Sequence, residues 1–164
     1  MAKSRSGISY TREKYIGGVP QSKISRFTMG DPHGKFEYLV SLVALSEVTI
    51  SHKALEAARV SANKVLYDKL GGTGYFLRLY VYPHEIIREH KLMGFAGADR
   101  LSEGMRRAFG KPSDRAAKIK VNQKVLTISI NKDHIELAKN AIKRATSKLP
   151  MPYRITVEKT SQVV

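Results

Sequence analysis

One stretch in the first third of the chain is apolar almost without interruption, and it limits what the chain can fold into. Residues 36–45 read FEYLVSLVAL and are rich in strand-forming side chains. A short run of this kind is typical of an interior strand of a sheet. We therefore expect a central strand here, with the other elements arranged around it.

Two helices are predicted from apolar residues spaced three and four apart. The first extends from a cap at Ser51 to Leu70, where Gly71-Gly72 stop it. The second begins at Asp133, with Glu136 three positions on in a capping-box-like start. Its termination is predicted at two prolines, and the inward-facing residues of both helices are expected to be Leu55, Ala58, Ala62, Val65, Leu66, Ile135, Ala138, Ile142, Ala145 and Leu149.

Strands are predicted over 75–82, 86–90, 117–121, 125–130 and 153–159, with 117–130 forming a hairpin. The order β-α-β-β-loop-β-β-α-β predicts an α+β fold. Specifically, we expect a single-domain sandwich with a mixed or largely antiparallel sheet and both helices on one face. The opposite face is expected to carry Arg78, Tyr80 and Tyr82.

The charge of the chain concerns its partners rather than its fold. The 164 residues include 29 Lys and Arg against 14 Asp and Glu, a net charge of +15, while 42% of residues are hydrophobic. That length and composition fit one packed domain. Because a polyanion relieves the self-repulsion of so basic a protein, we expect nucleic acid as partner, ahead of a membrane surface or an acidic protein.

Residues 1–35 carry a net charge of +5 and are predicted to form an extended basic arm, ahead of a globular domain over 36–164. Glycine and proline break every period in the arm. Basic and aromatic residues alternate from Tyr10 to Tyr15, as suits base stacking with phosphate contact. A loose terminus is the alternative.

Residues 93–112 form a second unusual segment, with four glycines, several cations and no apolar period. Long irregular loops inside compact domains are uncommon and are usually functional or disordered. Leu101, Met105 and Phe109 recur at every fourth position among arginines. We predict a loop that holds phosphate and presents apolar tips. A short surface helix over 102–109 is the alternative.

Enzyme chemistry finds little support. The chain has no Cys, which excludes disulfides, thiolate metal sites and a Cys nucleophile. The glycines at 71–74 follow a helix rather than open one, and Pro112 stands where a phosphate-binding loop needs Ser or Thr. The five His are dispersed and are expected on the surface, so we predict no catalytic, metal or cofactor site. Neither a membrane span nor a signal peptide is evident, and a cytoplasmic location is expected.

The segment AGADRLSEGMRRAFGKP at 96–112 resembles the signature loop of a ribosomal protein family. This is the universal large-subunit protein sixteen family, called the ten-e type in archaea and eukaryotes. The resemblance extends to Gly18-Val19-Pro20 and Lys23-Ile24, to residues 54–59 and 62–64, and to Pro83-His84 with Arg88. The lack of Cys and of a long C-terminal extension is similar to the archaeal branch.

The resemblance implies a structural ribosomal protein and no enzyme, with an α/β hammerhead-like fold. It implies binding to large-subunit rRNA near the 5S rRNA and the A-to-P-site tRNA corridor, beside neighbouring ribosomal proteins. The loop would reach toward the peptidyl-transferase centre. Ser113-Asp114-Arg115 departs from the small-residue linker expected after the loop. The residues implied to face rRNA or tRNA are Arg100, Met105, Arg106, Arg107, Phe109 and Lys111 in the loop, and Arg5, Arg12, Lys14, Lys23 and Arg26 in the arm.

Two other functions are left open by the residues alone. A free-standing RNA-binding regulator could use the sheet face with Arg78, Tyr80 and Tyr82. A basic nuclease or RNA-modifying enzyme could use His84 or His90. The first predicts that the protein does not travel with ribosomal subunits, and the second predicts turnover of RNA.

Overall fold

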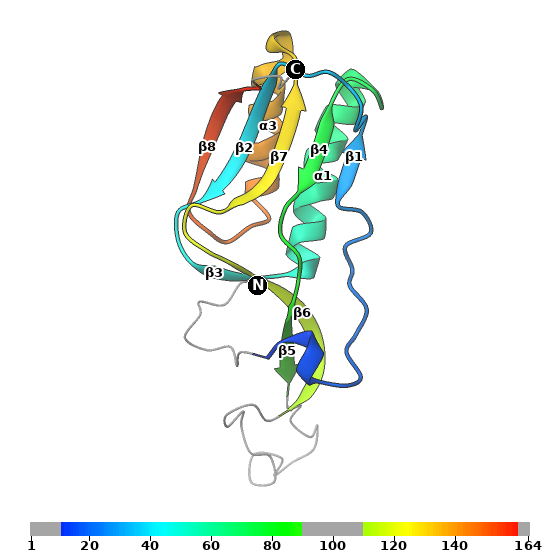
Figure 1. Cartoon of the computed structure of the whole chain (residues 1–164), viewed down its shortest axis with the longest axis vertical. Coiled ribbons are helices and arrows are strands. Elements are labelled where there is room, and N and C mark those ends of the chain that lie inside the picture. The colour runs from blue at the N-terminus through cyan, green and yellow to red at the C-terminus, as the bar shows by residue number, and fades with distance from the viewer. Residues whose placement is uncertain (1–10, 90–109, 161–164) are drawn as a thin grey trace, which may run out of the picture.

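A computed structural model describes residues 11–89 and 110–160. Within these residues two α-helices interrupt a series of eight strands in an elongated molecule (Figure 1). Their bounds are η2 Glu13–Tyr15, β1 Thr28–Gly30, β2 Tyr38–Ala44, β3 Val48–Ser51, α1 His52–Leu70, β4 Phe76–Leu79, β5 Glu85–Glu89, β6 Lys111–Ile119, β7 Lys124–Ile130, η3 Lys132–His134, α3 Ile135–Thr146 and β8 Tyr153–Lys159.

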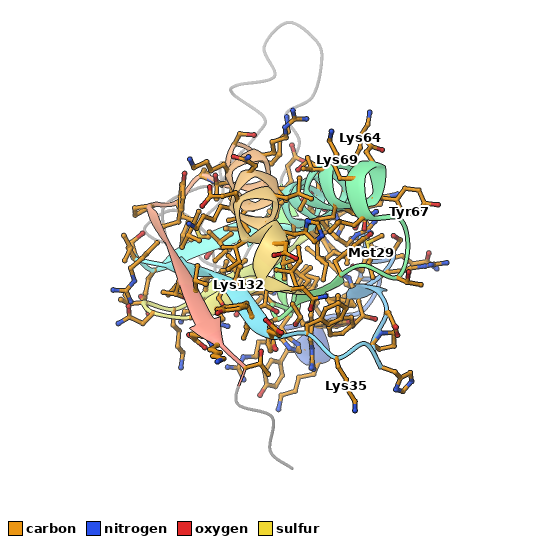
Figure 2. All side chains as sticks on the ribbon, turned by 90° about the horizontal axis from the view of Figure 1, so that it is seen from above. Met29, Lys35, Lys64, Tyr67, Lys69 and Lys132 are labelled. Atoms are coloured by element: carbon orange, nitrogen blue, oxygen red, sulfur yellow. The ribbon has the colours of Figure 1, made fainter. Side chains whose placement is uncertain are left out.

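The larger part, which we call the body, is a five-stranded antiparallel sheet with α1 and α3 packed on one face (Figures 1 and 2). Its strand order is β1-β4-β7-β2-β8. Strand β2 pairs with β7 on one side and β8 on the other, so the apolar run at 36–45 is the interior strand that was predicted. Side chains such as Leu42, Leu126 and Ile142 fill the space between sheet and helices. The predicted α+β class with both helices on one face is confirmed.

Helix α1 begins and ends where the sequence indicates. The Ser51 hydroxyl accepts a hydrogen bond from the amide of Ala54, which satisfies an amide in the first turn. At the other end Gly71 has φ +66°, a conformation that favours glycine. Leu55 and Leu66 are fully buried, as the apolar stripe predicts.

The start of the second helix differs from the prediction. A short 3-10 turn, η3, precedes α3, and His134 at the helix N-terminus makes no capping bond through its side chain. The carboxylate of Glu136 accepts a bond from Lys139 at 2.8 Å instead of turning back to the helix start. The expected Asp133 cap is therefore wrong, because the preceding turn tightens the entry to the helix.

A smaller antiparallel sheet of order β3-β6-β5 extends beyond the body, below it in Figure 1. Here the predicted 117–130 hairpin is wrong, because β6 lies in this sheet and β7 in the other. The turn itself forms, with Asn122 at φ +61°. However, the amide of Asn122 donates to the carbonyl of Ala44, and the amide of Ala44 donates to the carbonyl of Gln123. These bonds hold the turn at the end of β2, where the two strands diverge.

Residues 11–27, which we call the N-terminal segment, follow the outside of the molecule and lead into β1. Strand β1 pairs with β4 and thereby extends the body sheet, a pairing that the sequence does not indicate. Gly30 has φ +85°, and a Cβ at this position would overlap the carbonyl oxygen of Tyr75. Ile24 is buried in the body core. The described part of the predicted arm is therefore packed against its own protein.

Candidate nucleic-acid interface

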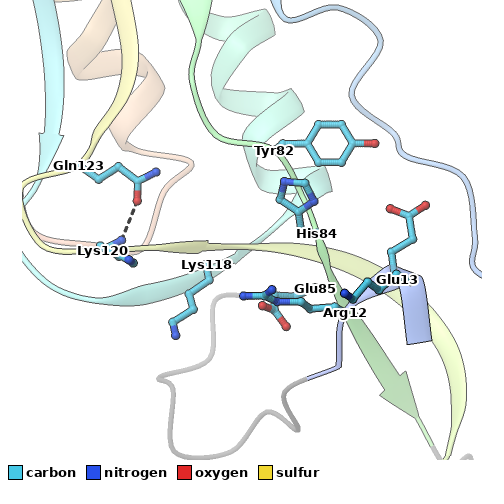
Figure 3. Close-up of a pocket in the computed structure, with 9 residues that line it drawn as sticks. Arg12, Glu13, Tyr82, His84, Glu85, Lys118, Lys120 and Gln123 are labelled. Carbon is cyan, nitrogen blue, oxygen red and sulfur yellow. Dashed lines mark hydrogen bonds between the residues drawn. The ribbon is translucent and has the colours of Figure 1, made fainter. Parts of the chain in front are cut away.

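A cleft of about 870 Å³ lies where the N-terminal segment meets the smaller sheet (Figure 3). Three separate parts of the chain form its walls: residues 12–14, the 82–85 stretch that leads from β4 into β5, and the end of β6 with the turn after it. The side chains that line it are Arg12, Glu13, Lys14, Tyr82, His84, Glu85, Lys118, Lys120 and Gln123.

Backbone pairing holds residues 12–14 at the cleft. Arg12 forms an isolated antiparallel bridge with Glu85 at the start of β5. The amide of Glu13 donates to the carbonyl of His84 at 3.1 Å. The N-terminal segment thus pairs briefly with the edge of the smaller sheet, which fixes where its cations lie.

The exposed charge of the cleft is positive. Four of its nine lining residues are Lys or Arg, against two carboxylates. Of these, Glu13 is paired with the guanidinium of Arg115 at 2.8 and 3.0 Å. Glu85 is buried, and burial raises the pKa of its carboxyl although Arg12 and Lys118 act in the opposite direction. Because cations outnumber carboxylates in the lining and Glu13 is already paired with Arg115, an anion is the ligand that the cleft favours.

Aromatic rings form one wall of the cleft. The rings of Phe27 and Tyr82 are stacked, with centroids 5.6 Å apart and planes at 22°. The imidazole of His84 lies on the same tyrosine, at 4.6 Å and 50°. Tyr80 does not join this series, since the Arg78 guanidinium lies over its ring at 4.8 Å. The sheet-face residues expected to act together are therefore divided between two environments.

Arg115, a residue of β6, holds the N-terminal segment against the smaller sheet. Its guanidinium is buried, makes the two bonds to Glu13, and also donates from Nε to the carbonyl of Pro20 at 2.6 Å. A planar group with several fixed donors suits such simultaneous contacts. The residue that departs from the family's expected linker thus ties the N-terminal segment to the strand that follows residues 93–110.

His52 makes a second connection nearby and corrects a prediction, because it is only 1% exposed rather than on the surface. Its Nδ1 accepts a hydrogen bond from the amide of Lys23 at 3.2 Å, and its Nε2 faces the carboxylate of Asp114. Lys53 also pairs with this carboxylate, at 2.9 Å. Burial lowers the pKa of His52 below its ordinary value of 6.5, and Asp114 partly opposes the shift. A neutral imidazole that accepts at Nδ1 carries its proton at Nε2, facing Asp114.

Comparison with known proteins identifies the family. The family described as Ribosomal protein L16p/L10e matches residues 6–156. A protein of Hyperthermus butylicus named large ribosomal subunit protein uL16 is 51% identical over 95% of this chain and 87% of its own length. Proteins of the same name from Staphylothermus marinus and Methanocella arvoryzae are 53% and 48% identical, over 92% and 100% of this chain and 86% and 95% of their own lengths.

The chain belongs to the L16p/L10e family. It is a structural constituent of the large ribosomal subunit and not an enzyme, and its similarity to these archaeal proteins supports the archaeal assignment. Binding to rRNA and to neighbouring ribosomal proteins follows from this membership. The cleft is accordingly a candidate surface for RNA.

The arm residues expected to face rRNA lie in different places. Arg12 and Lys14 line the cleft. Lys23 and Arg26 are exposed outside it, and the Lys23 amide is used by His52. Arg5 lies outside the described residues. The structure thus brings two of these five cations together with the aromatic wall.

Most of the expected loop residues lie outside the described residues, namely Arg100, Met105, Arg106, Arg107 and Phe109. Lys111 is described and exposed, but it is the first residue of β6 and pairs with Glu89. The loop was expected to extend to Pro112, which also lies in β6, opposite Arg88. A register shift between Ile87 and Arg88 accompanies this pairing, and prolines in strands commonly occur at such irregularities.

Among the cleft residues that sequence reasoning missed are Lys118, Lys120 and Gln123. Lys118 lies in β6 and Lys120 directly follows the strand; their spacing indicates a common face, but nothing local shows which other segment that face meets. The proximity of Tyr82 and His84 had a visible signal, since a single proline separates them. Proline favours extended backbone in the residue before it, which suits two side chains on one face.

Other site types receive no support from the described part of the chain. Within it there is no group of three or more His, Asp or Glu that could hold a metal ion. None of the described helices has the length and apolar character needed to span a membrane. His90, considered for an RNA-cleaving reaction, lies outside the described residues.

Proposed function

We propose that this protein binds large-subunit rRNA near the 5S rRNA and along the corridor through which tRNA passes from the A to the P site. In this proposal residues 93–112 extend toward the peptidyl-transferase centre. The body is a rigid support, and the protein assists subunit assembly and the positioning of tRNA. Family membership supports the ribosomal setting, and the positive cleft supports contact with RNA.

The proposed division of labour follows residue chemistry. Arg100, Arg106, Arg107 and Lys111 contact phosphates of rRNA or tRNA, and Met105 and Phe109 provide apolar contacts at the loop tip. Phosphate contacts position a protein on RNA without reading its sequence. Arm residues Arg5, Arg12, Lys14, Lys23 and Arg26 contact rRNA in the same manner. Specificity comes from RNA shape and from stacking on aromatic rings.

The observation that carries this proposal is the cleft, in which four cations surround an aromatic wall. Positive charge by itself does not locate an RNA surface here. Figure 2 shows Lys35 and Lys132 well away from each other and from Lys64 and Lys69, which both lie on α1. The cleft combines four Lys or Arg side chains with the rings of Tyr82 and His84, whose centroids are 4.6 Å apart. RNA binding uses that combination.

Directed hydroxyl-radical cleavage tests the location. The chain has no Cys, so Val121→Cys, at an exposed residue beside Lys120, provides one attachment point for an iron chelate. In reconstituted large subunits we expect strand cleavage near the 5S rRNA and the tRNA corridor. The Cys-free protein treated with the same reagent is the control. Cleavage confined to remote rRNA would contradict the proposed location.

The loop is tested by Arg100→Ala and Arg106→Ala. We expect these variants to reduce subunit maturation or tRNA accommodation while the melting temperature of the isolated protein stays the same. The protein should also sediment with large subunits through a high-salt wash, which a free-standing regulator would not do. Variants that melt several degrees lower but assemble and translate normally would show that the loop has another role.

A further inference from the structure

The two walls of the cleft carry different chemistry. On one side are the rings of Tyr82 and His84, and on the other are Lys120 and Gln123 (Figure 3). The volume of about 870 Å³ lies within the roughly 300–1,000 Å³ typical of sites for small organic groups. A flat phosphate-binding surface would need neither the depth nor the rings.

Phe27, Tyr82 and His84 form a series of neighbouring rings, and His84 is the end of the series that lines the cleft. Phe27 covers part of Tyr82, which remains 43% exposed, and the imidazole of His84 lies on the same tyrosine ring. His84 is itself exposed, and its backbone is fixed by bonds on both sides: its amide donates to the Tyr82 carbonyl, and its carbonyl accepts from Glu13. A ring held in this way is a stacking surface that needs little ordering when a ligand binds.

Gln123 contributes hydrogen-bonding groups opposite the rings. Its Oε1 accepts a bond from the amide of Lys120 at 2.8 Å, which fixes the orientation of the carboxamide. The Nε2 group of Gln123 therefore keeps its two donors for a ligand. Lys120, at the same turn, is exposed and can contact an adjoining phosphate.

We propose that the cleft binds a single unpaired nucleotide extruded from folded RNA. Its base stacks on His84 and accepts a hydrogen bond from Gln123, while Lys120 contacts a neighbouring phosphate. A base within a duplex is already stacked on both faces, so only an unpaired base can use the ring. This inference rests on the proposed function and adds to it the kind of RNA feature that the cleft recognises.

The experiment uses the full chain with two RNA hairpins that differ only in one bulged nucleotide. The bulge carries 2-aminopurine, whose fluorescence falls when it stacks on a ring. We expect the protein to bind the bulged hairpin more tightly than the fully paired hairpin, and to quench the probe. His84→Ala should lower affinity for the bulged hairpin about tenfold and remove the quenching, because one base–ring stack is lost. Affinity for the paired hairpin should not change.

Matched variants separate stacking from charge. His134→Ala removes an exposed imidazole on η3 and should leave both affinities unchanged. Lys120→Ala should weaken binding to both hairpins and reduce the slope of log affinity against log salt by about one. Lys132→Ala, at an exposed lysine outside the cleft, is its control. His84→Phe keeps a ring and should restore the quenching.

Equal affinity for the two hairpins, or quenching that persists in His84→Ala, would overturn the nucleotide site. The proposed function fails separately, because it depends on whether the protein enters large subunits at the proposed location. A protein that enters subunits normally but does not distinguish the hairpins would refute only this inference.

Discussion

Different interactions hold the two regions: apolar packing holds the body together, whereas polar contacts attach most of the N-terminal segment to the rest of the molecule. In the body, the interior strands and both helices bury large aliphatic side chains, many of them with no exposed surface. Among its described residues the N-terminal segment contributes one buried aliphatic side chain to the core, Ile24. Otherwise it is held by polar contacts: backbone bonds, such as those of Thr11 and Glu13 to the start of β5, and three buried basic side chains on other elements, Arg115, His52 and Arg59.

These three side chains contact the segment in sequence order. Arg115 binds Glu13 and the carbonyl of Pro20, and His52 accepts from the Lys23 amide. On α1, Arg59 pairs with Glu56 and donates to the hydroxyl of Ser25 at 3.0 Å. Apolar packing is additive and non-directional, whereas each of these contacts depends on one group. We therefore expect the body to unfold as a unit and the segment to detach locally.

The largest effect should come from a truncation in the body. Leu42→Ala removes a fully buried side chain from β2 and should lower the free energy of unfolding by about 2–5 kcal/mol, through lost burial and a cavity. Urea denaturation measures this. Val157→Ala, at a 41% exposed residue of β8, should lower the free energy of unfolding much less. Equal costs would mean that the body is not held by its apolar core.

Arg115→Met should have the next largest effect on stability, and that effect should be confined to the attachment of the N-terminal segment. It leaves Glu13 without its partner and removes the bond to the Pro20 carbonyl. Because Glu13 can turn to solvent, the cost should fall near the low end of the roughly 3–5 kcal/mol for breaking a buried pair. Hydrogen exchange at the amides of residues 13 and 86 should accelerate about tenfold or more, with body amides unchanged.

Arg115→Lys is the sharper companion to that variant. It keeps the charge but cannot make the two-pronged contact with Glu13 together with the bond to Pro20. We expect hydrogen exchange at the amides of residues 13 and 86 to be faster than in the wild type and slower than in Arg115→Met. Acceleration of exchange in β2 and β7 by either variant would show that segment and body are one cooperative unit.

The pH dependence of the segment should follow His52. Its pKa is lowered in the folded protein, so protonation is easier in the unfolded chain. Stability is unaffected well above pH 6.5 and falls as the pH drops below it, by at most about 1.4 kcal/mol per pH unit until the lowered pKa is reached. The groups that act on His52 are Asp114, Lys53 and Arg115.

Glu85 opposes this trend. Because burial raises the pKa of its carboxyl, the folded protein loses stability as the pH rises above the ordinary value of 4.5. The difference between wild type and His52→Gln isolates the histidine. Exchange at the Lys23 amide, measured from pH 7.5 to 5.5 after correction for intrinsic rates, should accelerate in the wild type and not in the variant. The same acceleration in both would assign the effect elsewhere.

The comparison also explains what the sequence could predict. Apolar periodicity is local, so the interior strand β2, helix α1 from its Ser51 cap to Gly71, and strand β8 at 153–159 were all predicted. The hairpin was wrong because bonds between Ala44 and a distant turn decide where β6 and β7 separate. The attachments of the N-terminal segment could not be predicted. Each joins residues far apart in the chain, 102 positions for Arg115 with Glu13.

The residues of the candidate site fall into the same two groups: those that the sequence indicates and those that only the fold brings together. Arg12 and Lys14 were found because they stand among aromatic residues in the sequence. Lys118 and Gln123 were not, because only the fold brings the β6–β7 turn opposite Tyr82 and His84. The departure at Asp114-Arg115 could be seen in the sequence, but its meaning required the partners that both side chains reach.

The smallest effect should come from an ion pair on the body surface. Lys124 and Glu158 join β7 and β8 across the sheet at 2.9 Å, and both side chains are at least 40% exposed. Glu158→Gln should therefore cost about 0.2–1 kcal/mol in urea denaturation, and less in high salt, because water and ions screen such pairs. The Arg115 pair differs from this one in two ways: Arg115 is buried, and its guanidinium makes two bonds to Glu13. If Glu158→Gln loosened the body as much as Arg115→Met loosens the N-terminal segment, ion pairs rather than apolar packing would support both regions.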